Sequence, residues 1–214
     1  MAEPQDRRNL IISCAAELFA RKGVGATTVR EIADAVGILS GSLYHHFESK
    51  DAIVDEVLGY YLDNIKKRYA EVMAGEKSPA ERLHELVYAS LLVAEECPHA
   101  TVIYQNELHY LREQPRFRHV QLAAADIQQT WLQVINEGVR DGSFRDNIEP
   151  RVFYRSIRDA VWLSTRWHRP KGPNPTERLA EDVTSIFLDG FSAKPRPAIP
   201  PAARRHRDRS ATGC

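Results

Sequence analysis

The 214-residue chain has no excess of charge of either sign, because 29 lysine and arginine residues balance 29 aspartate and glutamate residues. A balanced chain has no bulk positive field that would attract nucleic acid or anionic membranes regardless of sequence. Any binding to DNA must therefore come from a local surface. The apolar share of 43% is enough to bury a core.

Cysteines and long apolar runs are also scarce. Cys14, Cys97 and Cys214 lie far apart and form no C-x-x-C pair, which predicts reduced thiols rather than a disulfide framework or a zinc site. The longest uncharged apolar stretch, residues 86–94, is less than half of the ~20 residues that a membrane-spanning helix needs. The polar first ten residues lead into no secretory apolar segment. We expect a cytoplasmic protein without membrane contact.

Strand patterns are missing as well. No stretch of four or more residues alternates convincingly, whereas apolar residues recur at helical spacing along almost the whole chain. The sequence predicts an all-α fold of about nine helices. Capping residues and glycines mark the ends of the first four helices: Lys22-Gly23, Thr27 or Thr28, Gly37, Ser40 for a short third helix through Phe47, and Ser49 for a long fourth helix.

Composition divides the chain into three parts. All three tryptophans fall within the last 90 residues. We predict a three-helix module at residues 1–52, a larger helical body at 53–192, and a basic tail at 193–214 that lacks a periodic apolar face and is expected to be disordered. The fourth helix is expected to link the module to the body.

The most informative segment is TVREIADAVGILSGSLYHHFESK, residues 28–50. A short amphipathic helix, a turn at Gly37 and a third helix beginning three residues later match the geometry of a helix-turn-helix, whose second helix lies in the DNA major groove. The third helix carries small and polar side chains. Leu43 and Phe47, four residues apart, are expected to hold it against the core of the module.

Residues 28–53 resemble TetR-family transcriptional regulators at thirteen positions: Thr28, Ile32-Ala33, Gly37-Ile38, Gly41, Leu43-Tyr44, His46-Phe47, Ser49-Lys50 and Ile53. The resemblance covers about 45 residues. It implies a homodimer with an N-terminal DNA-binding domain, a C-terminal domain for ligand binding and dimerisation, and a repressor that a small molecule releases from DNA.

The family pattern also implies roles for individual residues. The expected phosphate or backbone contacts are Thr28, Arg30, Tyr44, His46 and Lys50, and the candidates for base edges are Ser40, Gly41, Ser42 and His45. The alternative is that Tyr44 and Phe47 are ordinary core aromatics. Residues 1–52 hold six basic and seven acidic residues, so we expect a shallow dependence of DNA binding on salt, with Arg7 and Arg8 as further backbone contacts.

A second, weaker resemblance is carried by residues 37–58, 102–117 and 157–173. These stretches are similar to actinobacterial repressors that control the breakdown of the last two cholesterol rings. That resemblance implies an effector that is a coenzyme A thioester of a bicyclic steroid remnant. No cofactor is expected.

Candidate ligand residues follow from spacing on the penultimate helix. Arg158, Trp162 and Arg166 are four residues apart and share one stripe, where arginines can pair with phosphates and tryptophan can stack on a flat ring. The alternative is a solvated face beside a core tryptophan. Further candidates, each of which can equally serve in capping or packing, are Gln105, Asn106, His109, Tyr110 and Trp131.

The last two helices are expected to form the dimer. The predicted interface residues are Phe153, Ile157, Val161 and Ser164 on the penultimate helix, and Val183, Ile186, Phe187 and Gly190 on the last. Two helices from each chain would form a four-helix bundle, and a two-fold dimer predicts a palindromic operator.

The alternatives are an enzyme and a regulator with a different effector. An enzyme is disfavoured because the sequence has no H-E-x-x-H, G-x-S-x-G, phosphate loop or dinucleotide motif. His45 and His46 point about 100° apart on a helix and cannot bind one metal together. A regulator that senses a fatty acyl-CoA or a cationic drug is the other alternative; a drug sensor would need buried carboxylates, whereas the best-defined polar candidates here are arginines.

Overall fold

The computed structural model describes residues 4–170, 172 and 175–190; the predicted basic tail at 193–214 lies outside them. All regular structure in these ranges is helical, which confirms the predicted fold class. The elements are α1 (Pro4–Lys22), α2 (Val29–Val36), α3 (Ser40–Leu43), α4 (Lys50–Ala74), α5 (Pro79–Glu96), α6 (Pro98–Asn106), α7 (Leu108–Glu113), η1 (Pro115–Phe117), α8 (Arg118–Arg140), α9 (Pro150–Leu163), η2 (Ser164–Arg166) and α10 (Thr176–Leu188).

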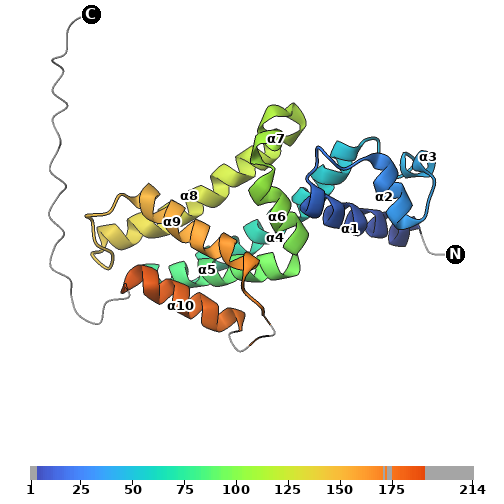
Figure 1. The fold of residues 1–214 in the computed structure, drawn as a ribbon. Helices are drawn as coiled ribbons and strands as arrows, with labels where there is room; N and C mark the ends of the chain where they lie inside the picture. The colour runs from blue at the N-terminus through green and yellow to red at the C-terminus, as the bar shows by residue number, and fades with distance from the viewer. Residues whose placement is uncertain (1–3, 171, 173–174, 191–214) are drawn as a thin grey trace, which may run out of the picture.

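The first three helices form a small lobe at one end of the molecule (Figure 1). Helix α1 ends at a glycine, Gly23, with φ of 86°. Thr28 caps α2 in a capping box with Glu31, and Gly37 at φ of 72° ends the helix. Gly23 and Gly37 are the predicted helix ends, and Thr28 is one of the two predicted caps, because each position depends on hydrogen bonds and backbone angles within a few residues.

The third helix is shorter than predicted. It ends at Leu43 rather than Phe47, and residues 44–46 form a turn closed by the Phe47 N–H donating to the Leu43 carbonyl at 3.0 Å. Ser40 was expected to cap this helix, but it is the first helical residue, and the N-cap is Leu39, which makes no side-chain bond. The helix is therefore held by tertiary packing rather than by its own cap.

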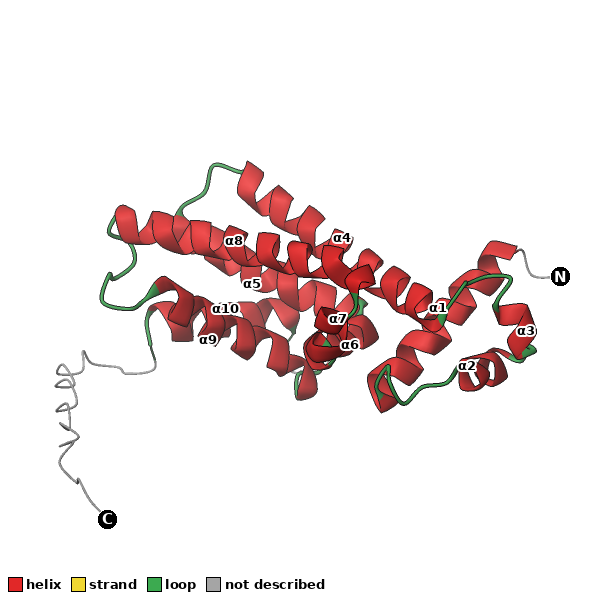
Figure 2. Ribbon diagram, turned by 90° about the horizontal axis from the view of Figure 1, so that it is seen from above, coloured by secondary structure: helices red, strands yellow, loops and turns green. Residues whose placement is uncertain are grey.

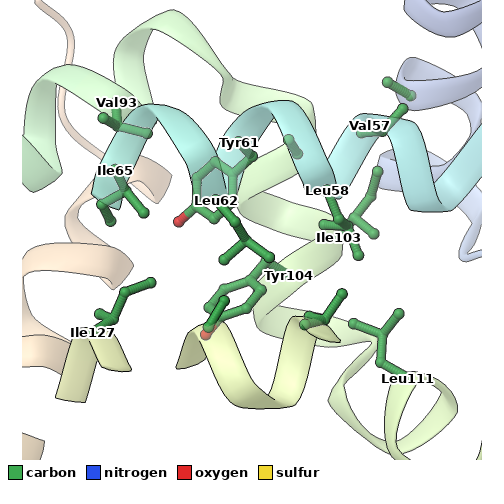
Figure 3. Close-up of a cluster of buried hydrophobic side chains, with 14 of the residues drawn as sticks. Val57, Leu58, Tyr61, Leu62, Ile65, Val93, Ile103, Tyr104, Leu111 and Ile127 are labelled. Atoms are coloured by element: carbon green, nitrogen blue, oxygen red, sulfur yellow. The ribbon is translucent and has the colours of Figure 1, made fainter. Parts of the chain in front are cut away.

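Helix α4 connects the module to the rest of the chain. Ser49 caps it, as predicted, by accepting from the Ala52 N–H, and its 25 residues make it about 37 Å long at the usual rise per residue. The views in Figures 1 and 2 show it running from the module along the helical body. Its buried face, including Leu58, Tyr61 and Leu62, packs with residues of α5, α6 and α8 (Figure 3).

The apolar residues Val102, Ile103 and Leu108 predict one helix after the break at Cys97-Pro98, but the structure has two. Helix α6 ends at Asn106, the φ and ψ of its C-cap Glu107, −100° and 17°, depart from helical values, and α7 starts at Leu108. With this extra break, the described residues form ten α-helices instead of about nine. No single helix in the described ranges is long and apolar enough to cross a membrane, although α5 and α6, which meet at a 106° bend, satisfy the length and composition criteria together.

Most of the apolar stripe on α9 that was expected at the dimer interface lies inside the chain and is not available to a partner, whereas the use of the last two helices for the dimer stays a prediction. Ile157, Val161 and Ser164 are buried because α9 packs against α5 and α8. Phe153 packs against Phe187 of α10, with ring centroids 5.7 Å apart. Two further predicted residues have local roles: Val183 is buried, and Gly190, at φ of 78°, follows the C-cap of α10.

Candidate functional site: a DNA-binding surface and a ligand cavity

The predicted base-reading residues lie on the surface of the module. Gly41 and His45 are exposed, and Ser40 and Ser42 are half-buried. Among the predicted phosphate contacts, Tyr44 is 55% exposed and His46 is half-buried. The exposure of Tyr44 contradicts the alternative that it is a core aromatic.

Two apolar residues fix this surface in place. Leu43 is fully buried and Phe47 is 3% exposed, as the sequence predicted. Because α3 has four residues and no side-chain cap, these two contacts with the module core are what orients its polar face.

The start of α2 carries the next predicted contacts. The Thr28 hydroxyl accepts from the Glu31 N–H at 3.2 Å and donates to the Glu31 carboxylate at 3.0 Å. A hydrogen bond from Lys22 and the bonds from Thr28 lower the pKa of Glu31 to about 2. Arg30 is exposed, 3.9 Å from Asp34 on the next turn. The guanidinium is therefore accessible beside the N-terminus of a helix, where anions bind favourably.

Lys50, expected to contact phosphate, has internal partners in the structure. Its Nζ donates to the carbonyls of Val24 and Thr27, at 2.6 and 2.9 Å, in the loop between α1 and α2. The side chain therefore holds that loop against the start of α4. Arg8 is similarly engaged, since it pairs with Glu56 and lies over the Phe47 ring.

A cavity of about 500 Å³ lies in the body, between α6, α7, α8, α9 and η2. Its lining residues come from a span of more than sixty positions in the sequence. They are Tyr104, Gln105, Asn106, Arg112, Gln121, Ala124, Ala125, Gln128, Tyr154, Arg158, Asp159, Trp162, Leu163 and Arg166. The volume lies within the ~300–1,000 Å³ of ordinary ligand pockets.

The deep side of this cavity is aromatic. Tyr104 and Tyr154 are buried, and the ring centroids of Trp162 and Tyr104 are 5.1 Å apart. Figure 3 shows Tyr104 beside the apolar residues of α4. Burial raises the pKa of Tyr104 to about 12, so its hydroxyl stays uncharged at neutral pH. This side suits an apolar, ring-shaped group.

The outer side is polar and mostly basic. Arg112 and Arg166 are exposed, and Arg158 is half-buried. Arg158 donates to Asp159 at 2.7 Å and lies over the Tyr154 ring. The lining therefore holds three arginines and one carboxylate, which is already paired, and this charge balance favours an anionic ligand.

The structure brings together some of the predicted ligand residues and separates others. Arg158, Trp162, Arg166 and Gln105 line the cavity together, and the Gln105 amide donates to the Trp162 carbonyl at 3.0 Å. Asn106 lies beside Gln105 in the same lining.

Trp131, Tyr110 and His109 are placed differently. Trp131 is 1% exposed and does not line the cavity: it donates to the Tyr69 hydroxyl at 2.9 Å and packs behind Tyr154. Tyr110 donates to Asp51 at the start of α4. The side chain of His109 lies outside the described residues.

Sequence reasoning missed Tyr104, Tyr154 and Arg112. Tyr154 lies four residues before Arg158, so extending the same stripe by one turn would have found it. Tyr104 and Arg112 carry no such spacing, because the break at Glu107 places them on different helices. Among the residues that the structure describes, no group of histidine, cysteine and acidic side chains is arranged to hold a metal ion.

A helix-turn-helix module joined by one long helix to a helical body with a ligand cavity defines a class: DNA-binding regulators that respond directly to a small molecule. Comparisons with known proteins agree. Residues 11–57 match the bacterial regulatory proteins of the tetR family, and residues 76–191 match the tetracyclin repressor-like C-terminal domain. The chain belongs to the TetR family of transcriptional regulators.

Two proteins of this family are similar to the chain over most of its length. The HTH-type transcriptional repressor KstR2 of Mycolicibacterium smegmatis is 41% identical over 191 residues, covering 89% of this chain and 93% of the relative. The structure of the ketosteroid transcriptional regulator KstR2 of Mycobacterium tuberculosis superposes with a TM-score of 0.81 at 40% identity, covering 91% of this chain and 98% of that one. The chain is thus a transcriptional repressor of the TetR family, similar to a ketosteroid transcriptional regulator, and not an enzyme.

The fold alone extends to more distant proteins. The structure of AibR in complex with isovaleryl coenzyme A and operator DNA matches with a TM-score of 0.74 at 20% identity, covering 86% of this chain and 100% of that one.

Proposed function

We propose that the protein is a cytoplasmic homodimeric repressor that leaves a palindromic operator when a coenzyme A thioester of a steroid-ring catabolite binds its cavity. The observation that carries the proposal is the gradient across the cavity, from buried aromatic rings to exposed arginines. An acyl-CoA has the same two-part character, with an apolar acyl group joined to a polyanionic carrier.

Each side of the cavity has a matching part of the ligand. The rings of Tyr104, Tyr154 and Trp162 offer flat apolar surface to a fused-ring acyl group. The exposed guanidiniums of Arg112 and Arg166 can form charge-assisted bonds to phosphate oxygens. The similarity to a ketosteroid transcriptional regulator supports a steroid-derived acyl group over a linear one.

A fatty acyl-CoA is the second candidate, because the same arginines serve its carrier. A cationic drug is disfavoured, since the one carboxylate in the lining, Asp159, is already paired with Arg158. The aromatic side of the cavity distinguishes the steroid-ring thioester from the fatty acyl-CoA. A rigid ring system packs against the flat faces of the aromatic side chains, whereas a flexible acyl chain loses more conformational entropy when it binds.

The proposed dimer uses the outer faces of α9 and α10. The buried stripe is unavailable, but Val152 of α9 and Ile186 of α10 are 56% and 52% exposed. In a two-fold dimer, the two copies of α3 would enter consecutive major grooves of the operator, which lie ~34–36 Å apart. Binding of the effector is proposed to tilt α4, so that this separation no longer fits the operator.

Fluorescence anisotropy on labelled DNA from the upstream region of the gene tests this function. The complex is titrated with a steroid-ring acyl-CoA, a fatty acyl-CoA and free CoA. Selective release by the steroid thioester is expected. Trp162→Ala and Arg166→Ala should each weaken the response to the thioester by about tenfold or more. For Arg166 this agrees with ~1.5–3 kcal/mol for a bond to a charged group, and for Trp162 with the buried ring area plus ~0.5–1.5 kcal/mol for aromatic contacts. Tight DNA binding that no thioester relieves would contradict the proposed effector.

Two matched variants separate loss of the cavity from general damage. Trp167 is 62% exposed and does not line the cavity, and Arg169 is exposed outside it. Trp167→Ala and Arg169→Ala should leave release by the thioester unchanged. Equal losses in these controls would show that the effect is not specific to the cavity.

A further inference from the structure

The cavity and the DNA-binding module are joined by a direct contact in addition to α4. The Val24 N–H, in the loop between α1 and α2, donates to the Glu107 carboxylate at 3.1 Å. Glu107 is the residue between α6 and α7. This bond connects residues 83 positions apart and ties the junction of α6 and α7 to the module.

The shape of the loop is adapted to this carboxylate. A Cβ at Gly23 would lie 2.9 Å from Glu107 Oε1, so a larger residue would push the carboxylate away. The φ of 86° at Gly23 also favours glycine. Glycine at this position therefore both ends α1 and leaves the space that Glu107 occupies.

Two oppositely charged side chains, Lys50 and Glu107, bind the backbone of the loop between α1 and α2. Lys50 donates to its carbonyls at Val24 and Thr27, while Glu107 accepts from its N–H at Val24. Val24 itself is fully buried. Because Thr28 caps α2 directly after this loop, the position of the loop sets where the helix-turn-helix begins.

At its other side Glu107 is continuous with the cavity. Tyr104, Gln105 and Asn106, the three residues before it, all line the cavity, and Gln105 donates to the backbone of Trp162 on the opposite wall. A ligand that pushes this wall outward moves the peptide that carries Glu107. The coupling path therefore runs from the cavity wall through the Glu107 carboxylate to the loop between α1 and α2, and from that loop to the DNA-binding module.

We propose that Glu107 is the residue that reports occupancy of the cavity to the DNA-binding module, through its bond to the Val24 N–H. The bond belongs to the arrangement that binds the operator, and the effector breaks it. The effector part of this proposal depends on the proposed function; the contribution of Glu107 to operator binding does not. Glu107 is a positioning residue and touches neither DNA nor, by this proposal, the effector.

The test compares Glu107→Ala with Glu107→Gln in the full-length protein. Without effector, Glu107→Ala should weaken operator binding at least about fivefold, the lower end of ordinary couplings between sites. Glu107→Gln keeps an acceptor oxygen and should stay within about twofold of wild type. Linkage requires that a change favouring the released state also favours the effector, so Glu107→Ala should bind the steroid-ring thioester more tightly. A merely structural residue would not improve effector binding.

Hydrogen exchange at the Val24 amide reports on the bond itself. The amide should be protected in wild type and Glu107→Gln, exchange faster in Glu107→Ala, and exchange faster in wild type once the thioester is added. The control is Glu137→Ala, which removes a carboxylate paired with Arg82 at 2.8 Å within the body. This variant should leave Val24 exchange and both affinities unchanged.

The outcomes separate the two proposals. If no thioester binds wild type, the proposed effector is wrong, while operator affinity and Val24 exchange in the effector-free variants still decide the role of Glu107. Equal operator affinity in wild type and Glu107→Ala, or unchanged Val24 exchange, overturns that role. Weaker operator binding together with weaker effector binding also overturns it, because both losses would indicate general destabilisation.

Discussion

The two functional regions are built in opposite ways. The DNA-binding surface comes from residues 28–50, one continuous stretch in which caps, glycines and two apolar anchors determine which side chains face outward. The cavity comes from five elements between Tyr104 and Arg166, and its lining depends on how α6, α8 and α9 pack. Local interactions therefore define the first site, whereas tertiary packing defines the second.

The largest effect is expected from removing an anchor of the DNA-binding surface. Leu43→Ala leaves a cavity beneath a four-residue helix and should lower the free energy of unfolding by ~2–5 kcal/mol, the range for buried leucines. Operator binding should be lost while thioester binding persists, because the cavity lies in the body. Thermal melting and anisotropy measure both.

The control for this loss of stability is Leu39→Ala. Leu39 is 79% exposed, so this change should alter the melting temperature little. A variant Leu43→Ala that keeps full operator affinity would show that the surface does not depend on its anchor.

A second substitution tests whether Trp131 belongs to the core or to the ligand site. Trp131→Phe removes the N–H that donates to the buried Tyr69 hydroxyl and should lower the free energy of unfolding by ~1–3 kcal/mol. Thioester affinity should change less than threefold, since Trp131 does not line the cavity. Denaturant unfolding and calorimetric titration check the two effects, with the exposed Trp167→Phe as control. A loss of affinity without a loss of stability would restore Trp131 as a ligand residue.

A third substitution distinguishes two roles of Lys50. A lysine that contacts phosphate contributes ~0.9 to the slope of log K against log salt concentration. The internal bonds of Lys50 predict instead that Lys50→Gln keeps this slope and loses ~1.5–3 kcal/mol of stability. Anisotropy between 50 and 200 mM salt, about the range in which such slopes are commonly compared, separates the two.

Lys67→Gln serves as the control, because Lys67 is exposed on α4. It should change neither stability nor slope. A slope that falls by about one in Lys50→Gln alone would establish the phosphate contact that the family pattern implies.

These cases show what the sequence could and could not predict. Gly37 and Ser49 were placed correctly, and Thr28 was one of two predicted caps, because capping depends on neighbours within four residues. The aromatic side of the cavity was missed because Tyr104 and Tyr154 meet only after α6 and α9 pack on α4 and α8. The stripe on α9 was assigned to a dimer because an apolar stripe looks the same whether it faces another chain or α5.

The smallest effect concerns the capping box of α2. Hydrogen bonds from Lys22 and Thr28 lower the pKa of Glu31 from 4.5 to about 2. Its contribution to stability is therefore complete above about pH 4.5 and is lost as the pH falls toward 2. Glu31→Gln should flatten the dependence of the melting temperature on pH in this window.

The matched variant is Glu17→Gln, which changes an exposed carboxylate on α1. Its melting profile should follow that of wild type. Identical pH profiles for wild type and Glu31→Gln would show that the capping box adds nothing to stability.

The most direct test of the link between the two regions is calorimetric titration of the steroid-ring thioester into the protein, with and without bound operator. Linkage between the cavity and the DNA-binding surface requires that the operator weaken thioester binding by the same factor by which the thioester weakens operator binding. A hundredfold effect in both directions corresponds to a coupling of ~2.7 kcal/mol. Equal thioester affinity in the presence and absence of operator would contradict the coupling of the cavity to the DNA-binding module.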